Sequence, residues 1–253
     1  MSEVLFEAVG GVAVITLNRP EAKNAVTRAV SEAVAGFLDE LDRRPDLHVG
    51  VLTGAGGTFC SGMDLRAFLQ GEVVSLPGRG FGGLTERPPL KPLIAAVEGW
   101  ALAGGFELVL ACDLVVASAS ARFGLPEVKR GLVPRAGGLL RLPRLVPRAV
   151  ALEMVLTGEP MSATRAAEVG LVNRVTAEGR ALDGARELAS AIAANGPLAV
   201  ATSKEIVRTT EGRTLEEAFA VQRPLAEMVF ASEDAREGAA AFTEKRPPEW
   251  RNR

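Results

Sequence analysis

The spacing of apolar and polar residues predicts strands near the start of the chain. Two apolar-rich runs, Val4–Val9 and Val12–Leu17, flank Gly10 and Gly11, a pattern typical of a hairpin with a two-residue turn. From Thr27 onward, apolar residues recur at the spacing of one helix face, which predicts a helix that ends before Pro45.

A repeated unit follows. The apolar run at 49–53 predicts a buried strand, and small residues then lead to a helix start near 65. The apolar run Leu93–Val97 is likewise followed by small residues and by a helical segment that carries Glu107. The two units lie roughly 45 residues apart, a period that indicates strands stacked turn upon turn with helices outside.

The second half of the chain changes from strands to helices. A buried strand is predicted at 114–117, helices at 149–156 and 162–169, and a last strand at 171–175. Beyond 178 only helical patterns occur, at 181–194, at 197–209, after the capping box Thr214…Glu217, and at 232–242. We therefore expect a strand-rich body over 1–177 and a helical region over 178–253.

Two segments between these elements are rich in glycine. Residues 70–92 also contain several prolines and predict a mobile loop, long enough to have a function of its own. Residues 131–138 end in a glycine pair and predict a loop where backbones approach closely.

Composition excludes several classes of function. With 253 residues, 47% of them hydrophobic, the chain can bury a sizeable core, and its formal net charge of -2 gives no field that favours nucleic acid or an anionic membrane. Two cysteines and one histidine form no metal-ligand cluster, and His48 lies in a polar loop unsuited to a catalytic triad. With neither a secretory signal nor a membrane span visible, we expect a cytoplasmic protein without a bound metal.

Two carboxylates stand out as candidate chemistry. Glu107 falls in the first turn of a predicted helix, and Glu127 lies 20 positions later, at the end of a loop. Gly104 and Gly105, just before Glu107, could direct free amides at a ligand. The pattern is compatible with an acid/base site beside an anion hole, or with a tight packing joint and a carboxylate that complements the helix dipole.

Six motifs in order carry a resemblance to a known family. They are LNRP at 17–20, TFCSGMDL at 58–65, AAVEGWA at 95–101, GGFEL at 104–108, FGLPE at 123–127 and LTG at 156–158. Over essentially its whole length the chain resembles the enoyl-CoA hydratase/isomerase (crotonase) family. The resemblance implies an α/β fold, a spiral of ββα turns with a C-terminal helical trimerisation region.

The resemblance also implies the roles of the site residues. The backbone amides of Met63 and Gly104 would grip the thioester oxygen of an acyl-CoA substrate. Glu107 and Glu127 would hold a water between them, Glu107 assisting its attack at Cβ and Glu127 supplying the proton at Cα. Coenzyme A would arrive as part of the substrate, with no other cofactor.

Contacts to coenzyme A and to other subunits follow from the same resemblance. Residues expected to contact coenzyme A are Lys23, Asp64, Leu65, Arg66, Phe242 and Lys245, the last two reaching a neighbouring subunit. The region 178–253 would drive assembly and close the pocket. Its apolar residues Leu215, Phe219, Leu225, Val229 and Phe230 are too many for a free surface, which favours a trimer or hexamer.

Three residues depart from the family pattern. Met63 replaces a small residue, so that its side chain would narrow the acyl pocket. Ala103 replaces a frequent glycine, which is tolerable if its φ is negative. Arg135 replaces a glycine and would favour the ionised form of Glu127 if it pointed inward; we expect it to point outward.

The leading hypothesis is hydration of a trans-2-enoyl-CoA. The tail 241–246 with Trp250, and the segment 81–86, are most similar to crotonobetainyl-CoA (carnitinyl-CoA) hydratases, which makes a specialised hydratase one alternative. An enoyl-CoA isomerase is another. A crotonase-fold binding or assembly module without activity is a third alternative, which the intact pair Glu107/Glu127 disfavours.

Overall fold

The first two strands form the hairpin that the apolar pattern predicts. In the computed structural model, which describes residues 2–253, β1 (Val4–Val9) pairs antiparallel with β2 (Val12–Leu17). Val9 lies opposite Val12, so Gly10 and Gly11 alone make the turn, both at positive φ. Glycine adopts such angles without a Cβ clash.

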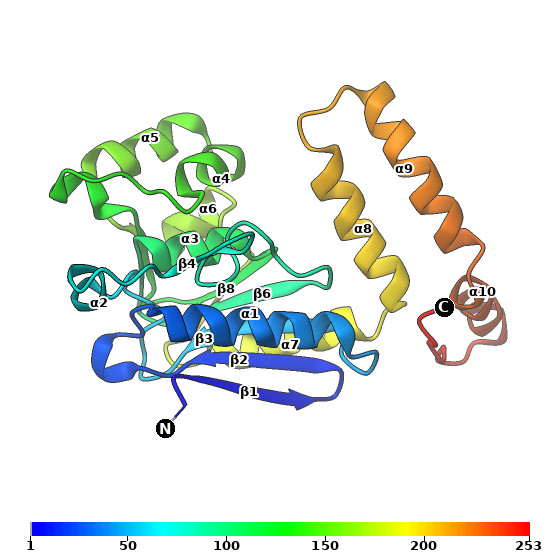
Figure 1. Cartoon of the computed structure of the whole chain (residues 1–253). Coiled ribbons are helices and arrows are strands. Elements are labelled where there is room, and N and C mark those ends of the chain that lie inside the picture. Colours follow the sequence, from blue (N-terminus) through cyan, green and yellow to red (C-terminus); the bar gives the residue numbers. More distant parts are fainter. Residues whose placement is uncertain (1) are drawn as a thin grey trace.

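A six-stranded sheet forms the centre of the body (Figure 1). Its order is β1-β2-β3-β6-β8-β11, and every pairing from β2 onward is parallel. The added strands are β3 (Val49–Gly54), β6 (Leu93–Val97), β8 (Leu114–Ser118) and β11 (Arg174–Thr176). Because parallel sheets need cover on both faces, their strands are almost wholly apolar, as β6 illustrates with five buried residues.

Two helices cover the opposite faces of this sheet. Helix α1 (Arg28–Arg43) buries one apolar stripe in the same cluster as Leu52 and Ala95. Helix α7 (Ala181–Ala193) packs its small residues against the alternate set, which includes Val51 and Ile94. Side chains alternate between the two faces of a strand, so neighbouring residues of β3 and β6 pack against different helices.

A smaller sheet lies next to the large one and completes the spiral. It contains β7 (Trp100–Leu102), β9 (Arg122–Gly124) and β10 (Met161–Ser162), and Cys60 bridges to Ala101 beside it. Each turn thus places one strand in the large sheet and one in the small sheet before a helix, as in β6–β7–α3 (Gly104–Ala111). The predicted spiral of ββα turns is confirmed, although its three-residue strands have no readable periodicity.

The remaining elements of the body agree in part with the prediction. Helices α5 (Arg148–Thr157) and α6 (Ala163–Glu168) occupy the expected positions, and α2 (Leu65–Leu69) follows the first repeat. Helix α4 (Gly138–Leu145) was not predicted. The last strand begins at Arg174 rather than at 171, because Leu171 and Val172 are buried in the core before the chain reaches the sheet.

The segment 70–92 is not the mobile loop that its composition predicts. It contains the short pair β4 (Ser75–Leu76) and β5 (Gly80–Phe81), and it buries Phe81 and Leu84 in the main core. A Cβ on Gly83 would lie 2.2 Å from the carbonyl oxygen of Ser31. Gly83 therefore allows close contact with α1.

Helices alone follow the last strand within the described residues. They are α7, α8 (Pro197–Thr210), α9 (Leu215–Phe230) and α10 (Glu233–Glu244), and the predicted capping box begins α9. Figure 1 shows α8 and α9 extending away from the sheet, whereas α7 lies against it. The division at 177/178 stays a prediction. In residues 2–253 no helix is both long and apolar enough to span a bilayer.

Candidate active site

Glu107 is held by a loop from elsewhere in the chain. It lies in the first turn of α3, a helix buried along its whole length, and is itself only 3% exposed. One carboxylate oxygen, Oε1, accepts hydrogen bonds from the amides of Ala136 at 2.7 Å and Gly138 at 2.8 Å. The carboxylate therefore has a fixed orientation inside the protein.

Gly138 explains the glycine pair in the loop before α4. A Cβ on Gly138 would lie 3.1 Å from Glu107 Oε1 and 3.1 Å from Glu107 Cγ, closer than side chains ordinarily pack. The close approach predicted for 131–138 is confirmed at Gly138, and its partner is Glu107. The contact between Gly138 and Glu107 was not predicted, although the second glycine pair was a signal for such a contact.

Opposing effects act on the Glu107 carboxyl. Burial raises its pKa, because desolvation disfavours the charged form, whereas the amides of Gly138 and Ala136 and the cations Arg141 and Arg135 favour that form. The amide bonds and both cations limit this rise, but burial is the larger effect, and the pKa of Glu107 stays above its ordinary value.

Glu127 has a different environment. It lies in the first turn of the 3₁₀ helix η2 (Pro126–Arg130), and its Oε2 is buried without a hydrogen-bond partner within the described residues. Burial raises the pKa of this carboxyl to about 7 and the negative charge of Glu107 adds to the rise, against the opposing effects of its own amide and of Arg130. Glu127 is therefore the member of the pair that holds a proton more readily, because Glu107 accepts two amides and lies near two cations.

The structure therefore brings two carboxyls of unequal acidity together. A pair whose environments separate their protonation states can supply a base and an acid to one reaction. A partnerless buried oxygen in a native structure calls for an explanation, such as a catalytic role. Glu127 Oε2 is such an oxygen, and water or substrate is the partner that an acid/base site would supply.

Two backbone segments meet beside this pair. A Cβ on Gly62 would lie 3.2 Å from the amide nitrogen of Gly104, so the loop that carries Met63 touches the start of α3. Gly104 is the first residue of that helix, where the amide has no partner inside the helix. Its N–H is thus available to an anion, with the positive end of the helix dipole behind it.

The amide of Met63 is directed away from its neighbouring strand. Met63 forms a parallel bridge with Val26. The amide of Val26 donates to the carbonyl of Gly62 at 2.8 Å, and the amide of Asp64 donates to the carbonyl of Val26 at 3.0 Å. Residues alternate in direction along such a bridge, which leaves the Met63 N–H on the other side. The two predicted anion-hole amides therefore lie in adjacent segments, and neither donates to a backbone group within residues 2–253.

Gly104 and Gly105 are also a packing joint. A Cβ on Gly104 would lie 2.6 Å from the ring of Phe81, and one on Gly105 would lie 2.2 Å from the carbonyl oxygen of Cys60. The two interpretations of the glycine pair thus hold together, since tight packing is what fixes the amide of Gly104. Phe81, which sequence analysis did not assign to the site, supports this position.

Ala103 does not meet the condition under which an alanine is readily tolerated, a negative φ. Ala103 has φ 51° and ψ -128°, a region that residues with a Cβ rarely occupy. Its amide donates to Gly124 O at 2.9 Å, and its carbonyl accepts from Phe106 and Glu107 at 2.9 and 3.0 Å. These contacts hold the strained residue next to the candidate anion hole, where such strain is commonly found.

Met63 and Arg135, the other two departures, occupy different environments. The Met63 side chain is partly buried and packs against the main core, so it occupies space beside the candidate anion hole. Arg135 is exposed, as expected, and its charge acts on Glu107.

The predicted coenzyme A contacts lie in two separate places. Lys23 is exposed, and its carbonyl accepts from Ser61 at 3.0 Å, next to the loop that carries Met63. Asp64 caps α2 and pairs with Arg19 at 3.0 Å, so its carboxylate already has partners. Leu65 and Arg66 follow it and are exposed.

Phe242 and Lys245 are not brought to this site within the chain. Phe242 is 88% exposed on α10, and Lys245 ends that helix in a left-handed conformation. Figure 1 shows α10 and α2 on opposite sides of the molecule. Any contact of these two residues with coenzyme A would have to involve another subunit.

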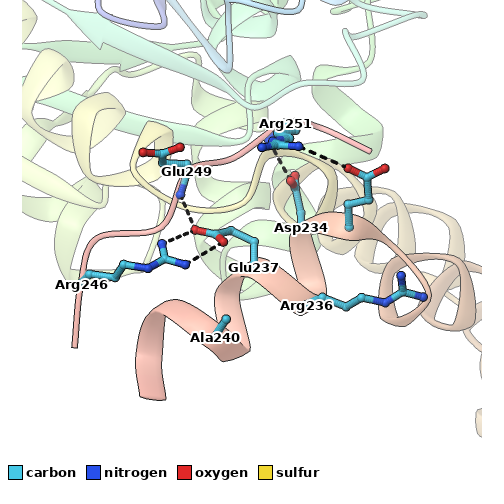
Figure 2. Close-up of a pocket in the computed structure, with 8 residues that line it drawn as sticks. Asp234, Arg236, Glu237, Ala240, Arg246, Glu249 and Arg251 are labelled. Carbon is cyan, nitrogen blue, oxygen red and sulfur yellow. Dashed lines mark hydrogen bonds and ion pairs between the residues drawn. The ribbon is translucent and has the colours of Figure 1, made fainter. Parts of the chain in front are cut away.

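A hollow beside α10 is separate from the candidate site. Figure 2 shows it between α10 and the C-terminal segment, where Glu237 accepts from Arg246 at 2.6 Å and from the amide of Glu249 at 2.8 Å. These pairs hold the C-terminal segment on the helix. Within residues 2–253, no group of three or more His, Cys, Asp or Glu side chains is arranged to hold a metal ion.

Comparisons with known proteins identify the family of the chain. The enoyl-CoA hydratase/isomerase family model matches residues 7–253. The enoyl-CoA hydratase EchA19 of Mycobacterium tuberculosis is 42% identical over 99% of this chain and 97% of its own length, and a carnitinyl-CoA dehydratase of Proteus mirabilis is 44% identical over 96% of each chain.

A solved structure shows the same similarity in three dimensions. The crystal structure of the enoyl-CoA hydratase EchA1 of Mycobacterium marinum has a TM-score of 0.98 and 56% sequence identity, with each chain fully covered. The resemblance seen in the six sequence motifs thus extends to the whole chain and to its fold. The chain belongs to the enoyl-CoA hydratase/isomerase family.

Proposed function

We propose that this protein hydrates the double bond of a trans-2-enoyl-CoA thioester. The observation that carries the proposal is the pairing of Glu107, whose carboxylate accepts two backbone amides, with Glu127, whose buried Oε2 has no partner within residues 2–253. Hydration needs a base for the incoming water and an acid for Cα, and the pair offers both.

The anion hole stabilises the charge that the reaction creates. As water attacks Cβ, electron density moves to the thioester oxygen, which the amides of Met63 and Gly104 would bind. Each such donor contributes about 3 kcal/mol in comparable oxyanion holes. Glu107 takes a proton from the water as its oxygen bonds to Cβ, and Glu127 gives its proton to Cα, so one water is added overall.

A direct assay tests this function. Purified protein is mixed with crotonyl-CoA, and the loss of ultraviolet absorbance from the conjugated enoyl thioester is followed while the product is identified by mass. The proposal expects enzyme-dependent conversion to a 3-hydroxyacyl-CoA, heavier than the substrate by one water. An unchanged substrate mixture would contradict it, and would favour a binding or assembly module that retains the fold alone.

A specialised hydratase is the second candidate. A relative named carnitinyl-CoA dehydratase is 44% identical to the chain. The large side chain of Phe81 lies against Gly104, and Met63 follows Gly62 in the loop that touches Gly104. A parallel assay with crotonobetainyl-CoA distinguishes the candidates. A higher kcat/KM for crotonobetainyl-CoA than for crotonyl-CoA identifies the specialised enzyme, and the reverse order identifies a general one.

Assembly into a trimer or hexamer is part of the proposal. Helix α9 buries no residue within the chain, which is unusual for a helix with a substantial apolar face. Its exposed large apolar residues include Leu215, Phe219, Met228 and Phe230. Sedimentation at micromolar concentration should give three or six copies of the chain, and a monomer alone would contradict this part.

Coenzyme A would be bound as part of the substrate, without a resident cofactor. Lys23 and the backbone at Asp64, Leu65 and Arg66 would contact it in one subunit, with Phe242 and Lys245 supplied by a neighbour. Turnover should therefore persist after dialysis against a metal chelator. A cytoplasmic location is proposed too, since both Cys60 and Cys112 are free thiols, as is common in reducing compartments.

A further inference from the structure

Arg141 joins two parts of the candidate site that are distant in sequence. This half-buried residue of α4 donates from Nη2 to the carbonyl of Thr85 at 2.5 Å and from Nη1 to the carbonyl of Ala136 at 3.4 Å. The guanidinium also lies against Gly137, where a Cβ would be only 2.1 Å from Nη1. Arg141 therefore bridges two backbones beside Gly137, whose φ of 101° favours a residue without a side chain.

One end of this bridge leads to the base. Ala136, whose carbonyl accepts from Arg141, donates its own amide to Glu107 Oε1, and Gly138 donates the second. The backbone of Arg141 reinforces the same loop, since its amide donates to Gly137 O at 2.9 Å. The position of the loop that orients Glu107 thus depends on Arg141 through both main chain and side chain.

The other end of the bridge leads to the anion hole. Thr85, 2% exposed, accepts a hydrogen bond from the amide of Phe81 on its Oγ1 at 2.9 Å. The ring of Phe81 in turn lies against Gly104, where any Cβ would clash with it. Thr85 and Phe81 therefore fix the position of Gly104, the first residue of α3.

We propose that Arg141 is a positioning residue for the reaction. It fixes the position of the loop that orients Glu107 relative to the segment 81–85, which packs against Gly104. The inference rests on the proposed hydratase function. Only a guanidinium suits this place, because its planar fork can donate to two carbonyls in different directions, whereas an ammonium is a single point of charge.

The charges around both groups support this role. Arg141 and Arg135 each lower the pKa of Glu107 against the effect of burial, and Glu127 is the neighbouring acid. Burial lowers the pKa of Arg141 itself, and the charged or titratable groups that face it are Glu107, Cys112, Arg144 and Arg208. Loss of Arg141 should thus both loosen the Glu107 loop and raise the pKa of Glu107.

Three variants test the proposal. Arg141→Met removes the fork and the charge, and Arg141→Lys restores the charge without the fork. Arg144→Met is the matched control, since Arg144 lies on the same helix but is exposed, and its one ion pair within residues 2–253 is with Glu211 at 3.5 Å. Each variant is assayed with crotonyl-CoA across pH, and its unfolding midpoint is measured.

The expected pattern separates positioning from a merely structural role. Arg141→Met should lower kcat by about tenfold or more with a smaller change in KM, and should move the acidic limb of kcat/KM to higher pH. Arg141→Lys should return that limb toward wild type while kcat stays low, and Arg144→Met should match wild type. Wild-type kcat in either Arg141 variant, or an equal loss in Arg144→Met, would overturn the proposal.

A titration independent of turnover distinguishes this inference from the proposed function. The side-chain carboxyl of Glu107 is followed by ¹³C NMR, assigned by its absence in Glu107→Gln, in wild type and Arg141→Met. A raised pKa in the variant supports the inference even if wild type proves inactive toward crotonyl-CoA. An active wild type whose Glu107 titrates alike in both proteins would overturn it.

Discussion

The charge of Glu107 acts on Glu127, adding to burial in raising the pKa of the Glu127 carboxyl to about 7. The two groups therefore titrate as a coupled pair. At neutral pH the pair holds its proton chiefly on Glu127, because Glu107 accepts the amides of Ala136 and Gly138 that favour its ionised form.

A pH dependence of stability follows from this shift. The folded-state pKa of Glu127 lies above its ordinary value of 4.5, so the folded protein binds this proton more tightly than the unfolded chain. The stability linked to it is fully present below 4.5 and is lost as pH rises toward 7. Glu127→Gln has no carboxyl proton to lose. From pH 5 to pH 8 the unfolding free energy of wild type should therefore fall by about 1–2 kcal/mol more than that of Glu127→Gln, allowing for partial exposure.

Urea denaturation at those two pH values measures the difference. Both proteins are compared at one concentration, because assembly would shift apparent stability. Equal pH dependence of the two unfolding free energies would mean that Glu127 titrates normally in the folded protein.

The role of the Gly104 amide can be tested separately from the clash that any side chain at position 104 would make with the ring of Phe81. Phe81→Ala makes room for a side chain at Gly104, and in that background Gly104→Ala retains the N–H whereas Gly104→Pro removes it. Proline is well tolerated at the first position of a helix, so both should fold. The proline variant should turn over crotonyl-CoA about a hundredfold more slowly than the alanine variant.

Equal kcat in the two Gly104 variants would place the oxyanion site elsewhere. Circular dichroism and the unfolding midpoint check that both retain the fold. The Phe81→Ala parent provides the reference activity.

Ala103 gives a prediction about strain. At its φ of 51° and ψ of -128°, a residue with a Cβ costs about 1–3 kcal/mol, and glycine recovers this at an entropy cost of about 0.4–1 kcal/mol in the unfolded chain. Ala103→Gly should therefore stabilise the protein by about 1 kcal/mol. Ala101→Gly, in the adjacent strand and without a positive φ, should destabilise it. Urea midpoints in which both variants lose stability would show that Ala103 is not strained.

Local patterns predicted the elements that depend on local chemistry. The hairpin at Gly10 and Gly11 and the capping box at Thr214 are confirmed, because both rest on contacts between residues close in sequence. β7 and β9 are held by pairing with distant segments, and three residues are too few to show a period. The glycine-rich composition of 70–92 gave a wrong prediction of mobility, since Gly83 and Gly82 pack closely against α1 and α3.

The candidate site was predictable to a similar extent. The spacing of Glu107 and Glu127 suggested an acid/base pair, but only the family motifs implied that they face one water. The bridge from Arg141 to Thr85 spans 56 positions, and nothing in the local sequence marks it. The conformation of Ala103 is likewise imposed by its tertiary hydrogen bonds.

The most direct test replaces each member of the carboxyl pair. Glutamine keeps the shape of glutamate but cannot exchange a proton. Glu107→Gln, Glu127→Gln and the double variant should each bind a non-reactive acyl-CoA as wild type does, and Glu153→Gln, an exposed residue of α5, serves as control. The losses should be strongly non-additive, because the pair acts as one unit.

Turnover of crotonyl-CoA by the two single variants is the deciding measurement. The account predicts that hydration is abolished in both while binding of the acyl-CoA survives in both. An isomerase would instead retain activity with one carboxylate and prefer a 3-enoyl-CoA, shuttling one proton between Cα and Cγ. Near-wild-type hydration by either Glu107→Gln or Glu127→Gln would contradict the account.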